Sequence, residues 1–252
     1  MQVVRTTERT VGARYTLFTV LIVGNTTTQS SFKLLRPIEF SSKMLLSPSC
    51  VFLHVPKTGG TWVREALRAG GVPFEEFDEP HAHLSLCPSP DKFKFAFVRH
   101  PLTLYQSYWR FKMTNGWDAD NEFDVECGAD SFQAFVENVL AGHPGWCSRM
   151  FEDFVGERHN EIEFIGRFEQ LANDLVRALR LAGEPFDEAA LRAQPKVNVS
   201  VWPVHEAQWP AELAVRVIES ERDALVRFKY RVPARSGIAP LGLLPAVLQM
   251  FQ

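Results

Sequence analysis

The stretch from Val51 to Trp62, which reads VFLHVPKTGGTW, constrains the fold of this chain more than any other segment. A short apolar run typical of a strand leads into a tight turn with one lysine, two glycines and two threonines, and a helical pattern follows. The glycines let the backbone approach an anion closely, and the N–H groups and dipole at the start of a helix attract negative charge. Lys57 adds a full positive charge. The stretch therefore predicts a strand, a phosphate-binding turn and a helix.

Strand and helix patterns alternate along the rest of the chain. The run Phe93–Val98 is strongly strand-forming and ends at Arg99, and Val72–Phe77 and Ile162–Gly166 are further expected strands. We expect helices at Gly60–Ala69, from Pro101 through Trp109, after a Ser131 cap, from Leu171 to a stop at Gly183, after an Asp187 cap, and from Pro210 through Phe228. This alternation predicts an α/β domain with three layers, in which helices flank a central parallel sheet.

Charge and cysteine content limit the class of protein. A chain of 252 residues with 46% hydrophobic and 23% charged residues is expected to fold as a globular domain. The net charge of −3 argues against a nucleic-acid partner, so any basic site must be local. The four cysteines are widely spaced and lack a C-x-x-C motif, which argues against a zinc site or a disulfide framework and favours the cytoplasm.

The N-terminal region differs from the rest. We expect residues 1–45 to form a disordered or loosely packed extension, residues 46–232 the folded domain and residues 233–252 a C-terminal tail. The apolar run Tyr15–Gly24 follows three arginines and resembles part of a signal peptide, so a targeting segment is the alternative. The run is too short to span a bilayer, and membrane association is not expected.

Two basic positions are expected to converge in space. Ligands of open α/β sheets bind at the carboxyl ends of the strands. The Lys57 turn and Arg99 both follow predicted strands, so both belong at that edge. The order of residues in the turn is not that of a nucleoside triphosphatase loop, in which the lysine follows the glycines, because Lys57 precedes Gly59 and Gly60. No aspartate that would hold Mg²⁺ is evident at a later strand end.

These residues resemble two motifs of the sulfotransferases that use 3′-phosphoadenosine 5′-phosphosulfate (PAPS). The family's 5′-phosphosulfate loop, P-K-x-G-[GT]-T, is matched by residues 56–61. Its 3′-phosphate motif is matched by Arg99, Pro101 and Ser107, with the serine eight residues after the arginine. Weaker similarities lie at Ile165–Leu171 and at Lys196–Ser200, which resembles the family's C-terminal cofactor loop. The resemblance covers residues 48–230 and implies a P-loop-like sulfotransferase fold of the bacterial type.

The resemblance implies a set of cofactor-binding residues and no metal requirement. The 5′-phosphosulfate would be held by Lys57 and the turn, and the 3′-phosphate by Arg99 and Ser107, with further contacts from Lys196 and Ser200. Trp62 is expected either to support adenine or to lie in the core. The implied turn residues are Lys57, Thr58, Gly59, Gly60, Thr61 and Trp62.

The resemblance also implies catalytic roles. Family members promote in-line attack of an acceptor hydroxyl or amine on sulfur, and Lys57 would neutralise charge on the departing phosphate oxygen. A general base must accept the proton of the acceptor, and His81, His83 and Glu79 are the alternatives. The acceptor would be a small molecule, a carbohydrate or a lipid, selected by expected loops at Asn115–Asp130 and Gly142–Glu157.

Three residue positions beside these motifs carry structural expectations. His54 is expected to be a packed core histidine, His100 to cap the helix that starts at Pro101, and Arg167 to pair with Glu169. Two other functions remain open, namely a P-loop type phosphotransferase that uses a nucleotide and a non-catalytic module that binds anions or nucleotides.

Overall fold

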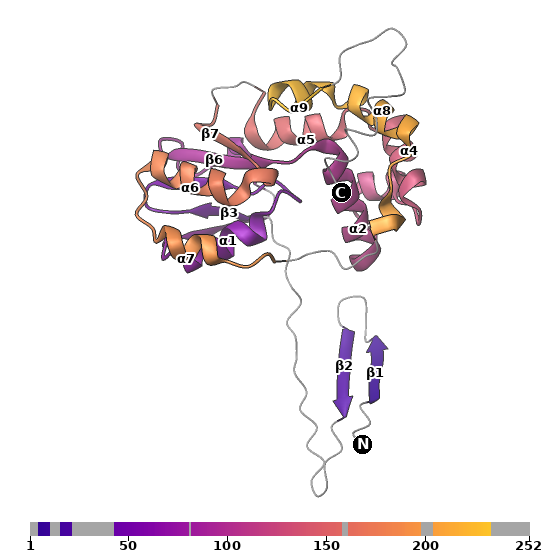
Figure 1. Cartoon of the computed structure of the whole chain (residues 1–252), viewed down its shortest axis with the longest axis horizontal. Coiled ribbons are helices and arrows are strands. Elements are labelled where there is room, and N and C mark those ends of the chain that lie inside the picture. The colour runs from indigo at the N-terminus through magenta and orange to yellow at the C-terminus, as the bar shows by residue number, and fades with distance from the viewer. Residues whose placement is uncertain are drawn as a thin grey trace, which may run out of the picture. The chain divides into compact units, whose positions relative to one another are not determined.

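The computed structural model describes residues 5–10, 16–21, 43–80, 82–157, 161–197 and 204–232 (Figure 1). The chain divides into two units, Met1–Ser41 and Ser42–Gln252. In the first unit, β1 (Arg5–Thr10) and β2 (Thr16–Leu21) pair antiparallel, so part of the expected extension forms a hairpin. The expected tail, residues 233–252, lies outside the described residues.

The second unit is built on a sheet of five strands in the order β5-β3-β4-β6-β7. The strands are β3 (Lys43–Leu46), β4 (Cys50–Leu53), β5 (Glu75–Pro80), β6 (Phe93–Val98) and β7 (Phe164–Arg167). Neighbours β4, β6 and β7 are parallel, whereas β3 is antiparallel to both β4 and β5. Four strands therefore run in one direction. The centre of the sheet is parallel as expected, and β3 is the exception, because a tight turn, with Ser47 N bonded to the Cys50 carbonyl at 2.9 Å, folds β3 back on β4.

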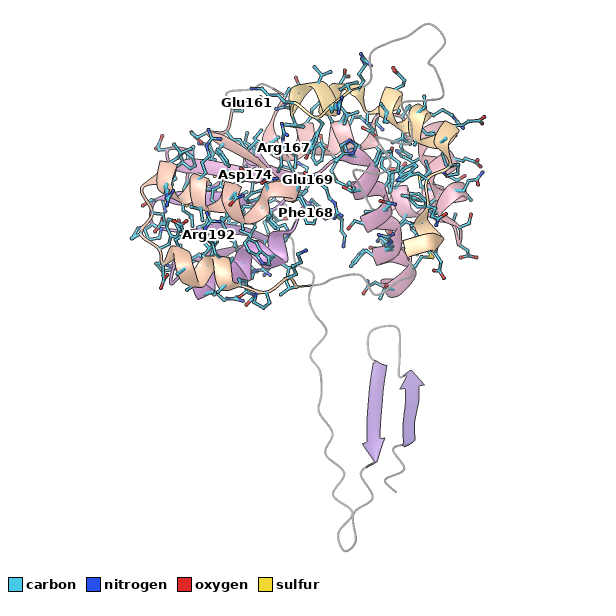
Figure 2. All side chains as sticks on the ribbon, viewed as in Figure 1. Glu161, Arg167, Phe168, Glu169, Asp174 and Arg192 are labelled. Atoms are coloured by element: carbon cyan, nitrogen blue, oxygen red, sulfur yellow. The ribbon has the colours of Figure 1, made fainter. Side chains whose placement is uncertain are left out.

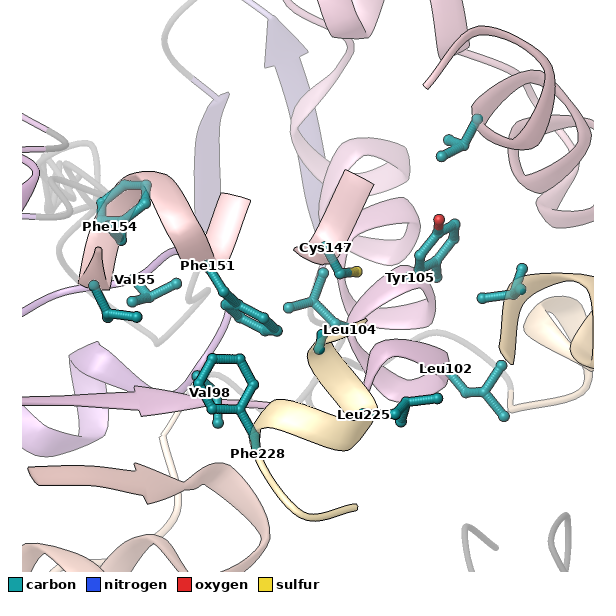
Figure 3. Close-up of a cluster of buried hydrophobic side chains, with 14 of the residues drawn as sticks. Val55, Val98, Leu102, Leu104, Tyr105, Cys147, Phe151, Phe154, Leu225 and Phe228 are labelled. Atoms are coloured by element: carbon teal, nitrogen blue, oxygen red, sulfur yellow. The ribbon is translucent and has the colours of Figure 1, made fainter. Parts of the chain in front are cut away.

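The side chains of the central strands alternate between two cores, as the pleat of a sheet requires. One core holds Val51, Leu53, Ala96 and Val98 with helices α2 (Pro101–Asn115), α4 (Phe132–Gly142), α5 (Trp146–Val155), α8 (Ala211–Ser220) and α9 (Arg222–Arg227). The other holds Cys50, Phe52, Phe95 and Phe97 with α1 (Gly60–Ala69) and α6 (Leu171–Ala182), beside α7 (Glu188–Ala193). The three-layer α/β class is thus confirmed, and Figure 3 shows part of the first core.

Local sequence signals placed most helix ends correctly. The Ser131 hydroxyl accepts the Ala134 N–H at 3.2 Å, and the Asp187 carboxylate accepts the Ala190 N–H at 3.0 Å. Gly183 ends α6 with a φ of 68°, a conformation that glycine adopts without strain. His100 caps α2, because its Nδ1 accepts the Leu102 N–H at 3.3 Å.

Four segments differ from expectation. The second strand lies at Glu75–Pro80 rather than Val72–Phe77. The expected loop Gly142–Glu157 is mostly helix α5, and Asn115–Asp130 contains α3 (Glu122–Cys127). The expected last helix is divided into α8 and α9.

Buried Glu221, at the junction of α8 and α9, explains both the division of that helix and the presence of α5. Its carboxylate accepts the N–H groups of Cys147 at 3.0 Å and Ser148 at 2.9 Å, and the Tyr105 hydroxyl at 2.8 Å. The first turn of α5 is therefore satisfied by a carboxylate more than seventy residues away, which no local pattern indicates.

Candidate active site

The carboxyl ends of four strands meet at one edge of the sheet, because β4, β5, β6 and β7 run in the same direction. The end of β4 leads to Lys57, that of β6 to Arg99 and that of β7 to Phe168. Glu79 lies near the end of β5, and the chain after β5 leads to His83. Figure 2 shows Arg167, Phe168 and Glu169 at the end of β7. The topology therefore brings together the strand ends that the sequence assigned to catalysis and to cofactor binding.

The turn after β4, residues 55–59, is called the Lys57 loop below. Thr58 is buried and its hydroxyl donates to the Val55 carbonyl at 2.8 Å. Gly59 has a φ of 92°, and a Cβ there would lie 2.7 Å from Cδ2 of Leu171. A Cβ on Gly60 would lie 1.9 Å from Nε2 of His54. Both glycines are therefore required by packing, and His54 is the buried histidine that the sequence predicted.

The N-terminus of α1 is open to a ligand. Within the described residues, no side chain caps it and no acidic residue lies in its first turn. The backbone ladder begins with Val63 N bonded to the Gly59 carbonyl at 3.1 Å, so the N–H groups of Gly60, Thr61 and Trp62 precede it. The Trp62 ring itself lies in the core, and its Nε1 donates to the Gln194 carbonyl at 3.2 Å. Trp62 thus contributes a backbone donor, while its ring is used for packing.

Lys57 is a half-buried cation that the described part of the chain does not pair with a carboxylate. Its ammonium lies 4.0 Å from the centre of the Phe111 ring on α2. Burial, together with the positive charges of Arg99 and Lys112, lowers its pKa to about 8. Lys112 differs, because it forms an ion pair with buried Asp124.

Arg99 is held on three sides. Its Nε donates to the Thr103 hydroxyl at 3.1 Å, and its Nη1 donates to the Lys57 carbonyl at 3.1 Å. The guanidinium carbon lies 4.0 Å from the centre of the Phe168 ring. Burial lowers the pKa of Arg99 to about 10; nearby Glu169 acts against this shift, and Arg110 adds to it.

Three α2 residues share the helix face that meets Arg99. Thr103, Ser107 and Arg110 are spaced at i, i+4 and i+7, and Thr103 is already bonded to Arg99. In the described part of the chain, the Ser107 hydroxyl has no hydrogen-bond partner. The Arg110 Nε is buried and has no hydrogen-bond partner there either, and burial lowers the pKa of this guanidinium. We did not predict Arg110 from the sequence, although its position three residues after Ser107 was the available signal.

Glu169 and Tyr230 support the backbone next to Arg99. The Glu169 carboxylate accepts the His100 N–H and the Tyr230 hydroxyl, both at 2.9 Å. Arg167 does not pair with Glu169 as expected; it donates to the carbonyls of Phe228 at 2.8 Å and Lys229 at 2.9 Å. Arg167 and Glu169 thus both form hydrogen bonds to the segment after α9 instead of to each other. No local signal indicates these contacts, because they join residues about sixty positions apart.

The other predicted site residues are less closely connected to the two motifs. His83 begins the short 3₁₀ helix η1 (Leu84–Leu86), and its ring centre lies 4.7 Å from that of Phe154. Phe154 and Val55 belong to the same buried cluster, so His83 packs close to the core beneath the Lys57 loop. Glu79 and Lys196 are exposed. His81 and Ser200 lie outside the described residues.

Comparison with known proteins identifies the class of protein. The sulfotransferase family model matches residues 47–195, more than half of the chain and the part that carries both basic motifs. The chain therefore belongs to the sulfotransferase family. Neither a curated protein nor a solved structure matches it.

The described residues contain neither a candidate metal site nor a candidate membrane-spanning helix. No cluster of three or more His, Cys, Asp or Glu side chains could hold a metal ion. None of the helices described is both long enough and apolar enough to span a membrane.

Proposed function

We propose that the chain transfers a sulfuryl group from PAPS to a hydroxyl or amine acceptor by in-line displacement. The observation that carries this proposal is a group of three cations at the sheet edge. Lys57, Arg99 and Arg110 have lowered pKa values, and no carboxylate forms an ion pair with them in the described part of the chain. A site of this kind favours a ligand with several negative charges.

Two sets of donors suit a ligand with two separate anionic groups. The open N-terminus of α1 and Lys57 form one set of donors, and Arg99, Ser107 and Arg110 form the other. PAPS carries a 5′-phosphosulfate and a 3′-phosphate, which match these two sets. Thr58 supplies its backbone N–H rather than its hydroxyl proton, which is donated to Val55.

The proposed reaction balances without a metal or an oxidant. The acceptor oxygen or nitrogen forms a bond to sulfur as the bond between sulfur and the phosphate oxygen breaks. His83, His81 or Glu79 takes the acceptor proton, and the Lys57 ammonium stabilises the charge on the leaving phosphate. Because β5 ends at the same edge of the sheet as β4, a base in the segment after β5 is compatible with this geometry.

The acceptor is proposed to be a small molecule, a carbohydrate or a lipid. We propose the cytoplasm as the compartment, and the four free cysteines support a reducing environment. A phosphotransferase and a non-catalytic anion-binding module remain the alternatives to sulfuryl transfer.

Two measurements test the proposed function. Calorimetry should give tighter binding of the product nucleotide, 3′-phosphoadenosine 5′-phosphate (PAP), than of ATP with Mg²⁺. The reverse order would favour the phosphotransferase. Incubation with ³⁵S-labelled PAPS and a panel of hydroxyl and amine acceptors should yield a labelled product, and Lys57→Met should form it about 10²–10³-fold more slowly. PAP binding without transfer to any acceptor would favour the non-catalytic module.

A further inference from the structure

The Arg99 side chain links the two proposed anion sites through a backbone carbonyl. Its Nη1 donates to the carbonyl of Lys57 at 3.1 Å, although the two residues are 42 positions apart. The bond to Thr103 and the stacking on Phe168 fix the guanidinium from two other directions. An arginine whose only role was to bind a 3′-phosphate would not need a hydrogen bond to the Lys57 loop, which belongs to the other anion site.

The backbone at Lys57 needs such support. Lys57 has a φ of 63°, a left-handed conformation that is strained for a residue other than glycine. The orientation of its carbonyl also matters for the next residue. In a trans peptide the C=O of one residue and the N–H of the next point in opposite directions, because the peptide unit is planar. By holding the Lys57 carbonyl, Arg99 therefore fixes the direction of the Thr58 N–H, the first donor of the loop.

We propose that Arg99 is a positioning residue for the Lys57 loop, in addition to the 3′-phosphate contact that the proposed function gives it. This inference rests on that function for its ligands. Its consequence is that loss of the arginine fork weakens the 5′-site even when the ligand has no 3′-phosphate. Lysine at position 99 would keep the charge, but it could not bond Thr103 and Lys57 and stack on Phe168 at the same time.

The decisive comparison uses two variants and two ligands. Ser107→Ala is the matched control, since Ser107 belongs to the same proposed anion site but makes no hydrogen bond to the Lys57 loop in the described part of the chain. Dissociation constants are measured by calorimetry for PAP and for 5′-AMP, which lacks the 3′-phosphate. Ser107→Ala should weaken PAP binding and leave 5′-AMP binding unchanged. Arg99→Lys should weaken 5′-AMP binding as well, by about three- to tenfold, the effect of one hydrogen bond.

A loss of affinity for PAP alone in Arg99→Lys would overturn the inference. Thr103→Val is a milder second variant in case the Arg99 substitution disturbs folding. It removes the partner of Nε and keeps the guanidinium, and it should weaken 5′-AMP binding about two- to threefold.

Hydrogen exchange tests the same inference without a ligand. In Arg99→Lys, the amides of Thr58 to Thr61 should exchange about three- to tenfold faster than in the wild type, whereas Ser107→Ala should leave them unchanged. Equal exchange in the wild type and Arg99→Lys would contradict the inference. A wild-type protein that fails to transfer sulfate from PAPS would instead contradict the proposed function, and the exchange result would still decide the role of Arg99.

Discussion

The ammonium of Lys57 lies 4.0 Å from the centre of the Phe111 ring, in a cation–π contact between the loop after β4 and the last turns of helix α2. The aromatic ring gives the charge partial compensation at a point where the described chain provides no carboxylate. A second ammonium group is close to Phe111, since that of Lys112 is 5.7 Å from the same ring centre. The Phe111 ring therefore gives the lysine a neutral surface from which an anionic ligand can withdraw it.

The lowered pKa of Lys57 predicts an alkaline limit to activity. Its folded pKa is about 8, so the ammonium loses its proton as the pH rises through that value, and kcat/KM for PAPS should fall about tenfold per pH unit above it. Lys57→Arg should move this limit upward because arginine stays protonated. Lys57→Met should lower kcat by about 10²–10³-fold at pH 7, the loss typical of one donor to a developing charge. A wild-type profile that is flat from pH 7 to 10 would contradict this role.

The lowered pKa of Lys57 also predicts an effect on stability. The protonated form that activity needs is the form that destabilises the fold. A lysine whose folded pKa is below its unfolded value destabilises the fold while it is protonated, and this cost fades between about pH 8 and 10.5. Lys57→Met should therefore raise the Tm of the unliganded protein at pH 7, and the gain should shrink as the pH approaches 10.5. Thermal unfolding at several pH values checks this, with Lys196→Met, at an exposed position, as the control.

Gly60 is predicted to tolerate no side chain. A Cβ at this position would lie 1.9 Å from Nε2 of His54, so Gly60→Ala should cost about 1–3 kcal/mol of unfolding free energy through overpacking. His54→Ala should recover part of that cost in the double variant. Gly142→Ala is the control, because the nearest atom to its Cβ would be 3.9 Å away, and its change should stay within about 0.5 kcal/mol. Urea unfolding is measured for the wild type, Gly60→Ala, the double variant and Gly142→Ala. If Gly60→Ala were as stable as the wild type, the His54 ring would have moved aside.

Much of the fold and of the local geometry of the candidate site could be predicted because those features have local causes. The glycines of the Lys57 loop, the Ser131 and Asp187 caps and the strand that ends at Arg99 are each encoded within a few residues. Helix α5 was missed because Gly142 and Gly145 lie just before its first residue, and because its first turn is stabilised by the distant carboxylate of Glu221. Strand β3 was missed because its four residues carry no pattern that distinguishes them from an extended segment.

The support of the site could not be predicted, because it joins residues far apart in the chain. The sequence motif contains Arg99, but nothing near it indicates that its guanidinium stacks on Phe168 and bonds to the Lys57 carbonyl. Glu169 and Tyr230 likewise meet only in the folded chain. Such contacts depend on the order and direction of the strands, which the local patterns leave open at β3.

The general base is predicted to be one of three residues, Glu79 near the end of β5 or His81 and His83 just after it. His81→Ala, His83→Ala and Glu79→Gln are assayed separately for kcat with labelled PAPS and for PAP affinity. One of them should lower kcat by about 10²–10⁴-fold while PAP affinity stays within about twofold, because a base acts on the acceptor rather than on the nucleotide. His143→Ala, whose imidazole bonds Glu126 at 2.6 Å, is the control for loss of a histidine. Near-normal kcat in all three variants would mean that the base lies elsewhere.

Arg110 is predicted to be a third donor to the 3′-phosphate, beside Arg99 and Ser107. Its buried Nε has no hydrogen-bond partner in the described chain, and its charge lowers the pKa of Arg99, so an anion between the two guanidinium groups would satisfy both. Arg110→Ala should weaken PAP binding about tenfold, as expected for a hydrogen bond to a charged group, and should change 5′-AMP binding less than twofold. It should not lower the Tm, because an unpaired buried donor contributes nothing to folding. Arg216→Ala, an exposed arginine on α8, is the matched control. Equal loss of affinity for both nucleotides would assign Arg110 to the general positive field of the site rather than to the 3′-phosphate.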